Sequence, residues 1–322
     1  MMDTLFSLSV SPHIRSKDSL QRIMWLVVLV LLPAGAAGVY IFGIRALFVI
    51  LSAVCGALLT EFVITRLMKK SLTISDGSAF ITGLLLAYNL PPGVPLWLPF
   101  IGSLFAIAIA KLAFGGLGYN IFNPALAGRV FLMASWPTHM TTWQLPRWYV
   151  DAITTASPLG LIKHGVTAEK LPSYVDLFIG NRAGCIGEVC IIVLLIGAVF
   201  LLWKGYISWH TPFSFIITVW ILSWMLMGKG FFRGDALFYV LNGGLILGAF
   251  FMATDMVTTP LTKKGMLVFG IGCGIITFVV RKWGGYPEGV SYSILIMNAA
   301  TPIIDRFTKP KKFGYVNLKK QK

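Results

Sequence analysis

Long apolar stretches recur from one end of this chain to the other, and they constrain its fold more than any other feature. A helix needs about 20 mostly apolar residues to cross the roughly 30 Å hydrocarbon core of a bilayer. The candidate spans, some shortened by polar interruptions, are Ile23–Ile41, Ala46–Ile64, Ser78–Leu90, Trp97–Phe114, Ile121–Trp136, Ile186–Trp203, Phe213–Met227, Leu237–Ala253, Met266–Val280 and Val290–Ile304. Together they predict a polytopic integral membrane protein.

The composition excludes a water-soluble globule. Of the 322 residues, 57% are hydrophobic and only 12% are charged, whereas a soluble domain carries about 25% charged residues. Arg15, Lys17 and Arg22 precede a first apolar stretch of full spanning length, so the beginning of the chain does not have the pattern of a cleavable signal peptide.

The basic residues indicate an orientation in the membrane. The net charge is +15, and with ten spans and a cytoplasmic N-terminus most of the lysines and arginines fall in cytoplasmic segments, as the positive-inside rule requires. Both termini are therefore predicted to be cytoplasmic, with a basic tail over 309–322, in the cytoplasmic (inner) membrane. This charge indicates topology and contact with the lipid bilayer, and no nucleic-acid partner is expected.

An internal repeat is the next feature. Landmarks recur at an offset of about 166 residues: Tyr40 with Tyr206, Gly83 with Gly248, and Gly115 with Gly284. Five spans in each half is an odd number, so the second half must cross the membrane in the opposite sense. The short stretches Ser78–Leu90 and Leu237–Ala253 end near prolines and are expected to meet at the centre, where other protein satisfies their backbone.

We therefore expect an all-α integral membrane fold of about ten transmembrane helices, in two inverted five-helix repeats with broken half-helices. The predicted units are a first repeat over 1–137, an extracytoplasmic linker loop over 138–185, a second repeat over 186–308 and the tail over 309–322.

Charged residues inside the apolar stretches are candidates for function, because intramembrane charge is costly and is often retained for a purpose. Glu61 and Lys111 lie close enough to a membrane interface to reach water. Arg129 is the deepest and needs a carboxylate or phosphate partner. Asp255, at the end of a broken helix, is the first choice for an ion-coordinating or structural carboxylate, and Glu188 is placed with it on an ion path.

Redox chemistry would need an organic cofactor. Four cysteines and four histidines are present, but they form no CxxC pair and no facing histidine pair within a span, so neither an iron–sulfur cluster nor a bis-histidine haem is predicted and no metal is expected. The glycine cluster at 115–118 lies between spans and is not a phosphate-binding turn. ATP-driven pumping is disfavoured.

Several segments along nearly the whole chain resemble the family that contains the D subunit of the Rnf complex and the B subunit of the sodium-pumping NADH:quinone reductase, with the Rnf protein the more similar. They are Ser11–His13, Thr82–Leu85 followed by Pro91-Pro92, Gly115–Ala125 (Gly-Gly-Leu-Gly-Tyr-Asn-Ile-Phe-Asn-Pro-Ala), Asn181–Glu188 and Phe251–Asp255 (Phe-Met-Ala-Thr-Asp). The glycine–asparagine segment and the last one are the most specific.

The resemblance implies a flavoprotein. Similar proteins carry FMN joined by a phosphodiester to a hydroxyl residue in the outer loop, within a motif Asp-x-x-Ser/Thr-Gly-Ala-Thr/Ser. Here that motif falls on Asp151–Ser157, with Thr155 in place of glycine and Ser157 in place of the usual threonine. The resemblance makes Ser157 the attachment residue, Thr154 and Thr155 the alternative hydroxyls, and Asp151 part of transferase recognition. Taken alone, the same residues are typical of a polar loop.

The resemblance also implies a second, non-covalent flavin, riboflavin. Its candidate lining residues are Thr82, Gly83, Asn120 and Asn123, because a flat apolar ring edged by hydrogen-bonding groups suits small residues and amides. Arg129 is a further candidate for cofactor binding, as a partner for the phosphate of an FMN. The asparagines are equally suited to cap broken helices.

The expected function is that of an electron-carrying membrane subunit of an ion-translocating ferredoxin:NAD oxidoreductase (Rnf) complex. Electron transfer would be coupled to Na⁺ or H⁺ transport, and the subunit would be part of a translocase without catalysing a reaction alone. Expected partners are the other membrane and peripheral subunits, including an extracytoplasmic flavin subunit and an iron–sulfur subunit, and a flavin transferase. The alternatives are a channel or secondary transporter for a small solute, which would have the same repeat, and an inert membrane anchor.

Overall fold

The computed structural model describes residues 18–70, 72–148, 154–163, 171–228 and 230–310. Over these residues the chain is mostly helical. The first part contains α1 (Leu20–Phe42), α2 (Ile44–Leu67), the turn η1 (Ile74–Asp76), α3 (Ser78–Tyr88), α4 (Trp97–Ala108), the turn η2 (Leu112–Phe114) and α5 (Pro124–Ser135). The second part contains α9 (Ile191–Trp203), α10 (His210–Leu226), α11 (Ala236–Leu241), α12 (Leu245–Leu247), the π-helical turn η4 (Gly248–Met252), α13 (Lys263–Trp283) and α14 (Val290–Thr308).

A linker of short elements joins the two parts. It holds α6 (Pro137–Met140), β1 (Trp143–Gln144), β2 (Thr154–Thr155), α7 (Pro158–Lys163) and α8 (Tyr174–Ile179). The two strands pair antiparallel, with Trp143 opposite Thr155 and Gln144 opposite Thr154. The Arg147 N–H donates to the carbonyl of Ile41 at 2.9 Å, which fixes the linker to the end of α1.

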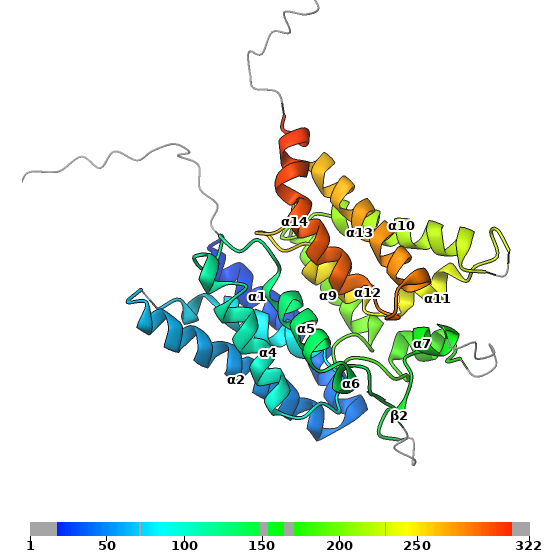
Figure 1. Ribbon diagram of the computed structural model, residues 1–322, viewed down its shortest axis with the longest axis horizontal. Helices are drawn as coiled ribbons and strands as arrows, with labels where there is room; N and C mark the ends of the chain where they lie inside the picture. The colour runs from blue at the N-terminus through cyan, green and yellow to red at the C-terminus, as the bar shows by residue number, and fades with distance from the viewer. Residues whose placement is uncertain (1–17, 71, 149–153, 164–170, 229, 311–322) are drawn as a thin grey trace, which may run out of the picture.

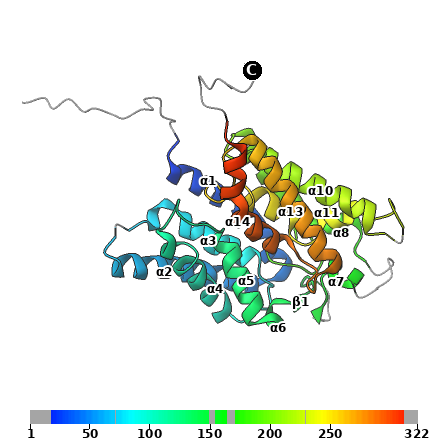
Figure 2. The same cartoon turned by 45° about the horizontal axis from the view of Figure 1, so that its top comes forward.

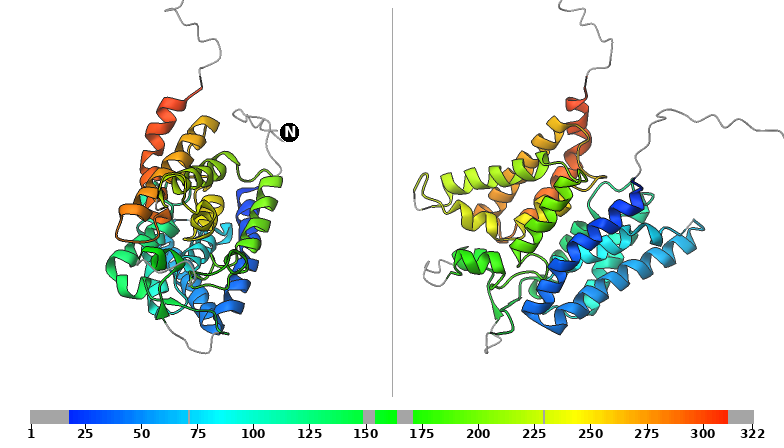
Figure 3. Two further views of the ribbon diagram at one scale, coloured as in Figure 1. Left: turned by 90° about the vertical axis from the view of Figure 1, so that its right-hand side faces the viewer. Right: turned by 180° about the vertical axis from the view of Figure 1, so that it is seen from behind.

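The two helical parts lie side by side as separate bundles. In Figure 1 the helices from α1 to α5 gather at the lower left and those from α10 to α14 at the upper right, and Figure 2 shows the same division after rotation. In Figure 1 the start of α1 and the end of α14 lie in the upper part of the molecule and the linker elements α6 and α7 lie in the lower part. The right-hand view of Figure 3 again shows the blue start of α1 and the red end of α14 on one side. Both described ends of the chain therefore share one side.

Four helical segments within the described residues are long and apolar enough to cross a membrane: Leu20–Phe42, Ile44–Leu67, Trp97–Phe114 and Lys263–Trp283. Four shorter apolar helices accompany them, namely α3, α5, α9 and α10. A multi-pass membrane protein is thus confirmed, while the count of ten spans stays a prediction. The predicted span Ile186–Trp203 starts before its helix, because α9 begins only at Ile191.

Local sequence explains where α5 begins and why α3 packs closely against α2. The Asn123 side chain accepts hydrogen bonds from the N–H groups of Ala125 and Leu126, and Pro124 occupies the first helical position of α5, where no N–H donor is needed. Gly83 explains how closely α3 approaches α2. A Cβ atom at position 83 would lie 2.8 Å from the carbonyl oxygen of Ala53, so no larger residue fits there without a shift.

The short segments α3 and η4 end near one another, at the boundary between the two bundles. The π-helical turn ends at Met252, and the Asn123 amide donates to the carbonyl of that residue at 3.3 Å. The Asn89 amide lies 3.5 Å from the Met252 sulfur, and the Asn298 side chain accepts from the Asn123 N–H at 3.2 Å. Side chains from each bundle thus pair with backbone groups of the other bundle at this boundary.

The linker helix α8 offers a test by pH. The Ser173 hydroxyl and the Asn181 amide donate to the Asp176 carboxylate, and these bonds hold the pKa of that carboxyl below its usual range. A carboxyl whose folded pKa is lowered stabilises the fold above its unfolded pKa, and this contribution is lost as pH falls through the folded value. We expect amide exchange in α8, corrected for the intrinsic rate, to accelerate at acid pH. The variant Asp176→Ala should show fast exchange at every pH, and a wild-type rate in that variant would contradict the assignment.

Candidate functional site

A cavity lies between the two bundles on the side of the chain ends. The space between its lining atoms amounts to about 870 Å³, and this figure includes the open mouth. Apolar side chains from α1, α3, α9 and η4 form most of its wall. The polar lining residues are Ser78, Thr82, Lys111, Asn120, Asn123, Tyr206, Thr254 and Asp255.

The cavity brings together three of the four residues predicted to line a flavin. Thr82, Asn120 and Asn123 all line it, and Asp255, predicted separately as an ion ligand, does so too. Gly83 does not, because its Cα faces α2. The Asn120 side-chain oxygen is buried without a hydrogen-bond partner among the described residues, so this wall retains an unused acceptor. Apolar walls with a few amide groups and a free acceptor fit a flat ring system with N–H groups on its edge.

A buried ion pair forms the end of this cavity nearest α2. The Lys111 ammonium lies 2.8 Å from a Glu61 oxygen and 2.7 Å from the Ser78 hydroxyl, and the Thr73 hydroxyl donates to the other Glu61 oxygen. The side chain of Glu61 is fully buried and that of Lys111 is nearly so. These two residues therefore pair inside the protein, where the sequence had suggested that each reaches water by itself.

A second buried charged group occupies the boundary between the bundles toward the linker. Arg129 donates to the side-chain oxygen of Asn89 at 2.6 Å and forms an ion pair with Glu288. The carboxylate partner that Arg129 was expected to need is thus Glu288, which precedes α14. Sequence reasoning missed Glu288 because its Tyr-Pro-Glu-Gly context is typical of a surface turn.

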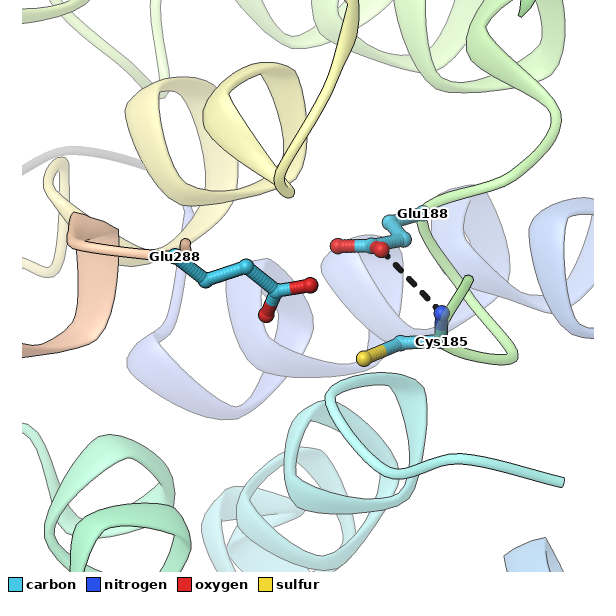
Figure 4. Close-up of side chains that lie close together, drawn as sticks. All are labelled: Cys185, Glu188 and Glu288. Carbon is cyan, nitrogen blue, oxygen red and sulfur yellow. Dashed lines mark hydrogen bonds between the residues drawn. The ribbon is translucent and has the colours of Figure 1, made fainter. Parts of the chain in front are cut away.

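Two further arginines complete this group. Arg182 donates to the Asn242 side chain and to the carbonyl of Glu188. Arg281 donates to the carbonyls of Tyr239 and Asn242. Figure 4 shows Cys185 and Glu188 on the loop before α9, with Glu288 extending toward them from the turn before α14. We call Arg129, Arg182, Arg281, Glu188 and Glu288 the arginine–glutamate cluster.

The predicted attachment motif lies only partly within the described residues. Asp151 lies outside them, and the backbone of Thr154 and Thr155 forms β2. Ser157 immediately precedes α7, is 4% exposed, and accepts a hydrogen bond from the Gly160 N–H at 3.3 Å.

A second pocket adjoins α7. Its polar wall is cationic, with Lys163, Arg281 and Lys282 beside Tyr239, and Leu159, two residues after Ser157, also lines it. These donors fit an anionic group attached near the start of α7.

Comparison with known proteins identifies the family. The family model described as NQR2, RnfD, RnfE matches residues 7–314. The D subunit of the proton-translocating ferredoxin:NAD⁺ oxidoreductase complex of Clostridium ljungdahlii is 51% identical over 96% of this chain and 96% of its own length. The D subunit of the Na⁺-translocating ferredoxin:NAD⁺ oxidoreductase complex of Acetobacterium woodii is 49% identical over 100% of this chain and 99% of its own length.

A more distant relative agrees with these two. The D subunit of the ion-translocating oxidoreductase complex of Stutzerimonas stutzeri is 37% identical over 92% of this chain and 93% of its own length. These matches confirm the resemblance seen in the sequence motifs. The chain belongs to the NQR2, RnfD, RnfE family.

Proposed function

We propose that this chain is the flavin-carrying membrane subunit of an ion-translocating ferredoxin:NAD⁺ oxidoreductase complex. It would relay electrons across the membrane in a process coupled to transport of Na⁺ or H⁺. The observation that carries this proposal is the cavity between the bundles, where Thr82, Asn120 and Asn123 come together. The full-length similarity to subunits of such complexes supports it. A solute transporter has no comparable support.

The fold proposed for this role is a pair of inverted five-helix repeats with ten spans. The helix contacts support it, because α1 packs against α9 and α5 packs against α14. In the repeat α9 corresponds to α1 and α14 to α5, and a two-fold relation brings such equivalent elements face to face. The linker would then be extracytoplasmic and both termini cytoplasmic.

A matched pair of buried cations also supports the repeat. Lys111 follows α4 and donates to Ser78, the first residue of α3. Arg281 lies near the end of α13 and donates to the carbonyl of Asn242, just before α12. In each half, a buried cation from the end of the long helix thus contacts the segment that contains the short helix.

We assign the covalent FMN to Ser157 and a non-covalent riboflavin to the cavity. When bound, these groups would supply one-electron carriers. For the flavin at Ser157, Lys163, Arg281 and Lys282 offer donors to a phosphodiester near α7.

In the cavity, the Asn120 oxygen is available to accept from a ring N–H. Lys111, which is paired with Glu61, lines the same cavity. Asp255 and Glu188 are the proposed carboxylates of the ion path. The proposed partners are the extracytoplasmic flavin subunit, an iron–sulfur subunit and the transferase.

The cavity assignment is tested by filling the space. Thr82 lines the cavity and donates to the carbonyl four residues earlier. Thr60 on α2 is equally buried, makes the same bond and does not line it. We expect Thr82→Met to lower the non-covalent flavin released from the purified complex by at least about tenfold, because about 1.4 kcal/mol of steric cost has that effect.

The control Thr60→Met should leave that flavin content unchanged, and both variants should keep the covalent flavin. Equal losses in the two variants would mean that general destabilisation, and not occupancy of the cavity, explains the effect. Unchanged flavin in Thr82→Met would rule the cavity out as the flavin site.

A further inference from the structure

The arginine–glutamate cluster places two carboxylates together inside the protein. Glu188 and Glu288 are 3% and 8% exposed. Their side chains point toward one another in Figure 4, with the Cys185 sulfur beside them. One oxygen of each carboxylate and the sulfur all lie within 4.8 Å of one another. Two buried like charges at this separation repel strongly unless a cation reduces the repulsion.

Each carboxylate has one oxygen with a partner and one without. A Glu188 oxygen accepts from the Cys185 N–H at 3.1 Å, and a Glu288 oxygen accepts from Arg129. Glu188 Oε2 and Glu288 Oε1 are buried and have no partner among the described residues. Gly244 leaves room at this point, since a Cβ atom there would lie 2.5 Å from Glu188 Oε2. A buried acceptor without a donor costs about 1–3 kcal/mol, so the pair is suited to bind something that donates.

The charges around the pair decide which cation fits. Arg129, Arg182 and Arg281 already outnumber the two carboxylates. A divalent metal would add two more charges to a region with an excess of positive charge. The thiol of Cys185 is a poor ligand for Na⁺, which leaves too few oxygen donors for a sodium cage. A proton needs only two facing oxygens, and one proton satisfies both unpartnered acceptors at once.

We propose that Glu188 and Glu288 bind one proton between them, as a carboxyl donating to a carboxylate. The proton forms an O–H bond with one free oxygen, and the other free oxygen accepts the hydrogen bond. One bridging water or a small side-chain rotation spans the separation. The other titratable or charged groups that face the pair are Arg129, Arg182, Arg281 and Cys185, with Tyr239 beside Arg281 and Tyr292 beside Arg129. The three arginines favour release of the proton, so the site is suited to exchange it.

The position of the site suggests its use. Arg129 and Asn89 belong to the first bundle, whereas Glu288 belongs to the second, so the proton lies beside an ion pair that joins the two bundles. Adding or removing the proton changes the charge beside the ion pair that joins the two bundles. Its use in ion transfer rests on the proposed function, whereas proton binding itself does not.

Infrared difference spectroscopy on the purified complex tests the proposal. Stepping pH from neutral to alkaline should remove a carbonyl-stretch band of a protonated glutamate, identified by ¹³C-labelling of glutamate in the wild type. Glu188→Gln and Glu288→Gln should each abolish this band. Glu61→Gln is the matched control, because both oxygens of the buried Glu61 have partners and it should contribute no such band. Cys185→Ala should leave the band in place.

Three results would overturn the proposal. The first is the absence of a protonated-glutamate band from the labelled wild-type complex. This measurement uses no variant, so it does not depend on whether a variant folds. The second is a band that persists in both Gln variants. The third is a band lost on adding Na⁺ at constant pH with proton release, which would assign the site to sodium. The claim that the pair binds a proton and the claim that it takes part in ion transport are separated by measuring the ions transported per electron in vesicles. A Gln variant that loses the band but keeps the wild-type ratio would show that the site is not on the ion path.

Discussion

Replacing Ser157 with Ala is expected to abolish covalent flavin and, with it, electron transfer through the complex. Wild-type subunit coexpressed with the flavin transferase should show a mass increase of one FMN, and the variant should show none. The physical reason is that a phosphodiester needs a side-chain hydroxyl, and alanine has none. Intact-mass spectrometry of the purified subunit measures this directly.

Two controls make the result specific. Ser157→Asn also lacks a hydroxyl, so it should lose the flavin. Its side-chain oxygen can still accept from the Gly160 N–H, as the Ser157 hydroxyl does, so α7 keeps its cap. Thr155→Ala should keep the mass increase. A mass increase that persists in Ser157→Ala would move the attachment to Thr154 or Thr155, and a colourless wild-type protein would end the electron-carrier proposal.

Replacing Arg129 with Met should destabilise the subunit strongly. The substitution leaves Glu288 buried without its counter-charge and removes the donor to Asn89. Breaking a buried ion pair from one side costs about 3–5 kcal/mol. Thermal unfolding of the purified subunit in detergent, followed by intrinsic fluorescence, is the measurement.

The double variant Arg129→Met with Glu288→Gln should recover most of this loss, because it removes both charges together. If the double variant is as unstable as the sum of the two single ones, the two side chains do not stabilise the fold as a pair.

The local elements of this fold could be predicted from sequence because they depend on neighbouring residues. The apolar run Ser78–Leu90 is short and ends before Pro91, and α3 indeed ends at Tyr88. The run Ala46–Ile64 lies within α2. Leu237–Ala253 was predicted as one interrupted segment. In the structure Asn242–Gly244 separates α11 from α12, and the π-helical turn follows α12 directly.

The pairing of charges could not be predicted in the same way. Glu61 and Lys111 are 50 residues apart, and Arg129 and Glu288 are 159 apart, so only the fold brings them together. One signal was available: a charge deep in an apolar stretch requires an opposite charge, and the number of candidate carboxylates is small. Applied to every acidic residue, including those in apparent turns, that rule would have made Glu288 a candidate. The three cavity residues Thr82, Asn120 and Asn123 were found because a family motif marked them.

The burial of Ser157 at the start of α7 has a consequence for biogenesis. At 4% exposure its hydroxyl is not presented to a second enzyme once the linker has packed. If the flavin is attached there, the transferase must act on the newly made chain before α7 packs. Attachment and packing then compete in time, and a subunit that packs first remains without its cofactor permanently. The fraction of flavinylated subunit in a preparation would then report the relative rates of these two events during synthesis, and supplying flavin afterwards would not raise it.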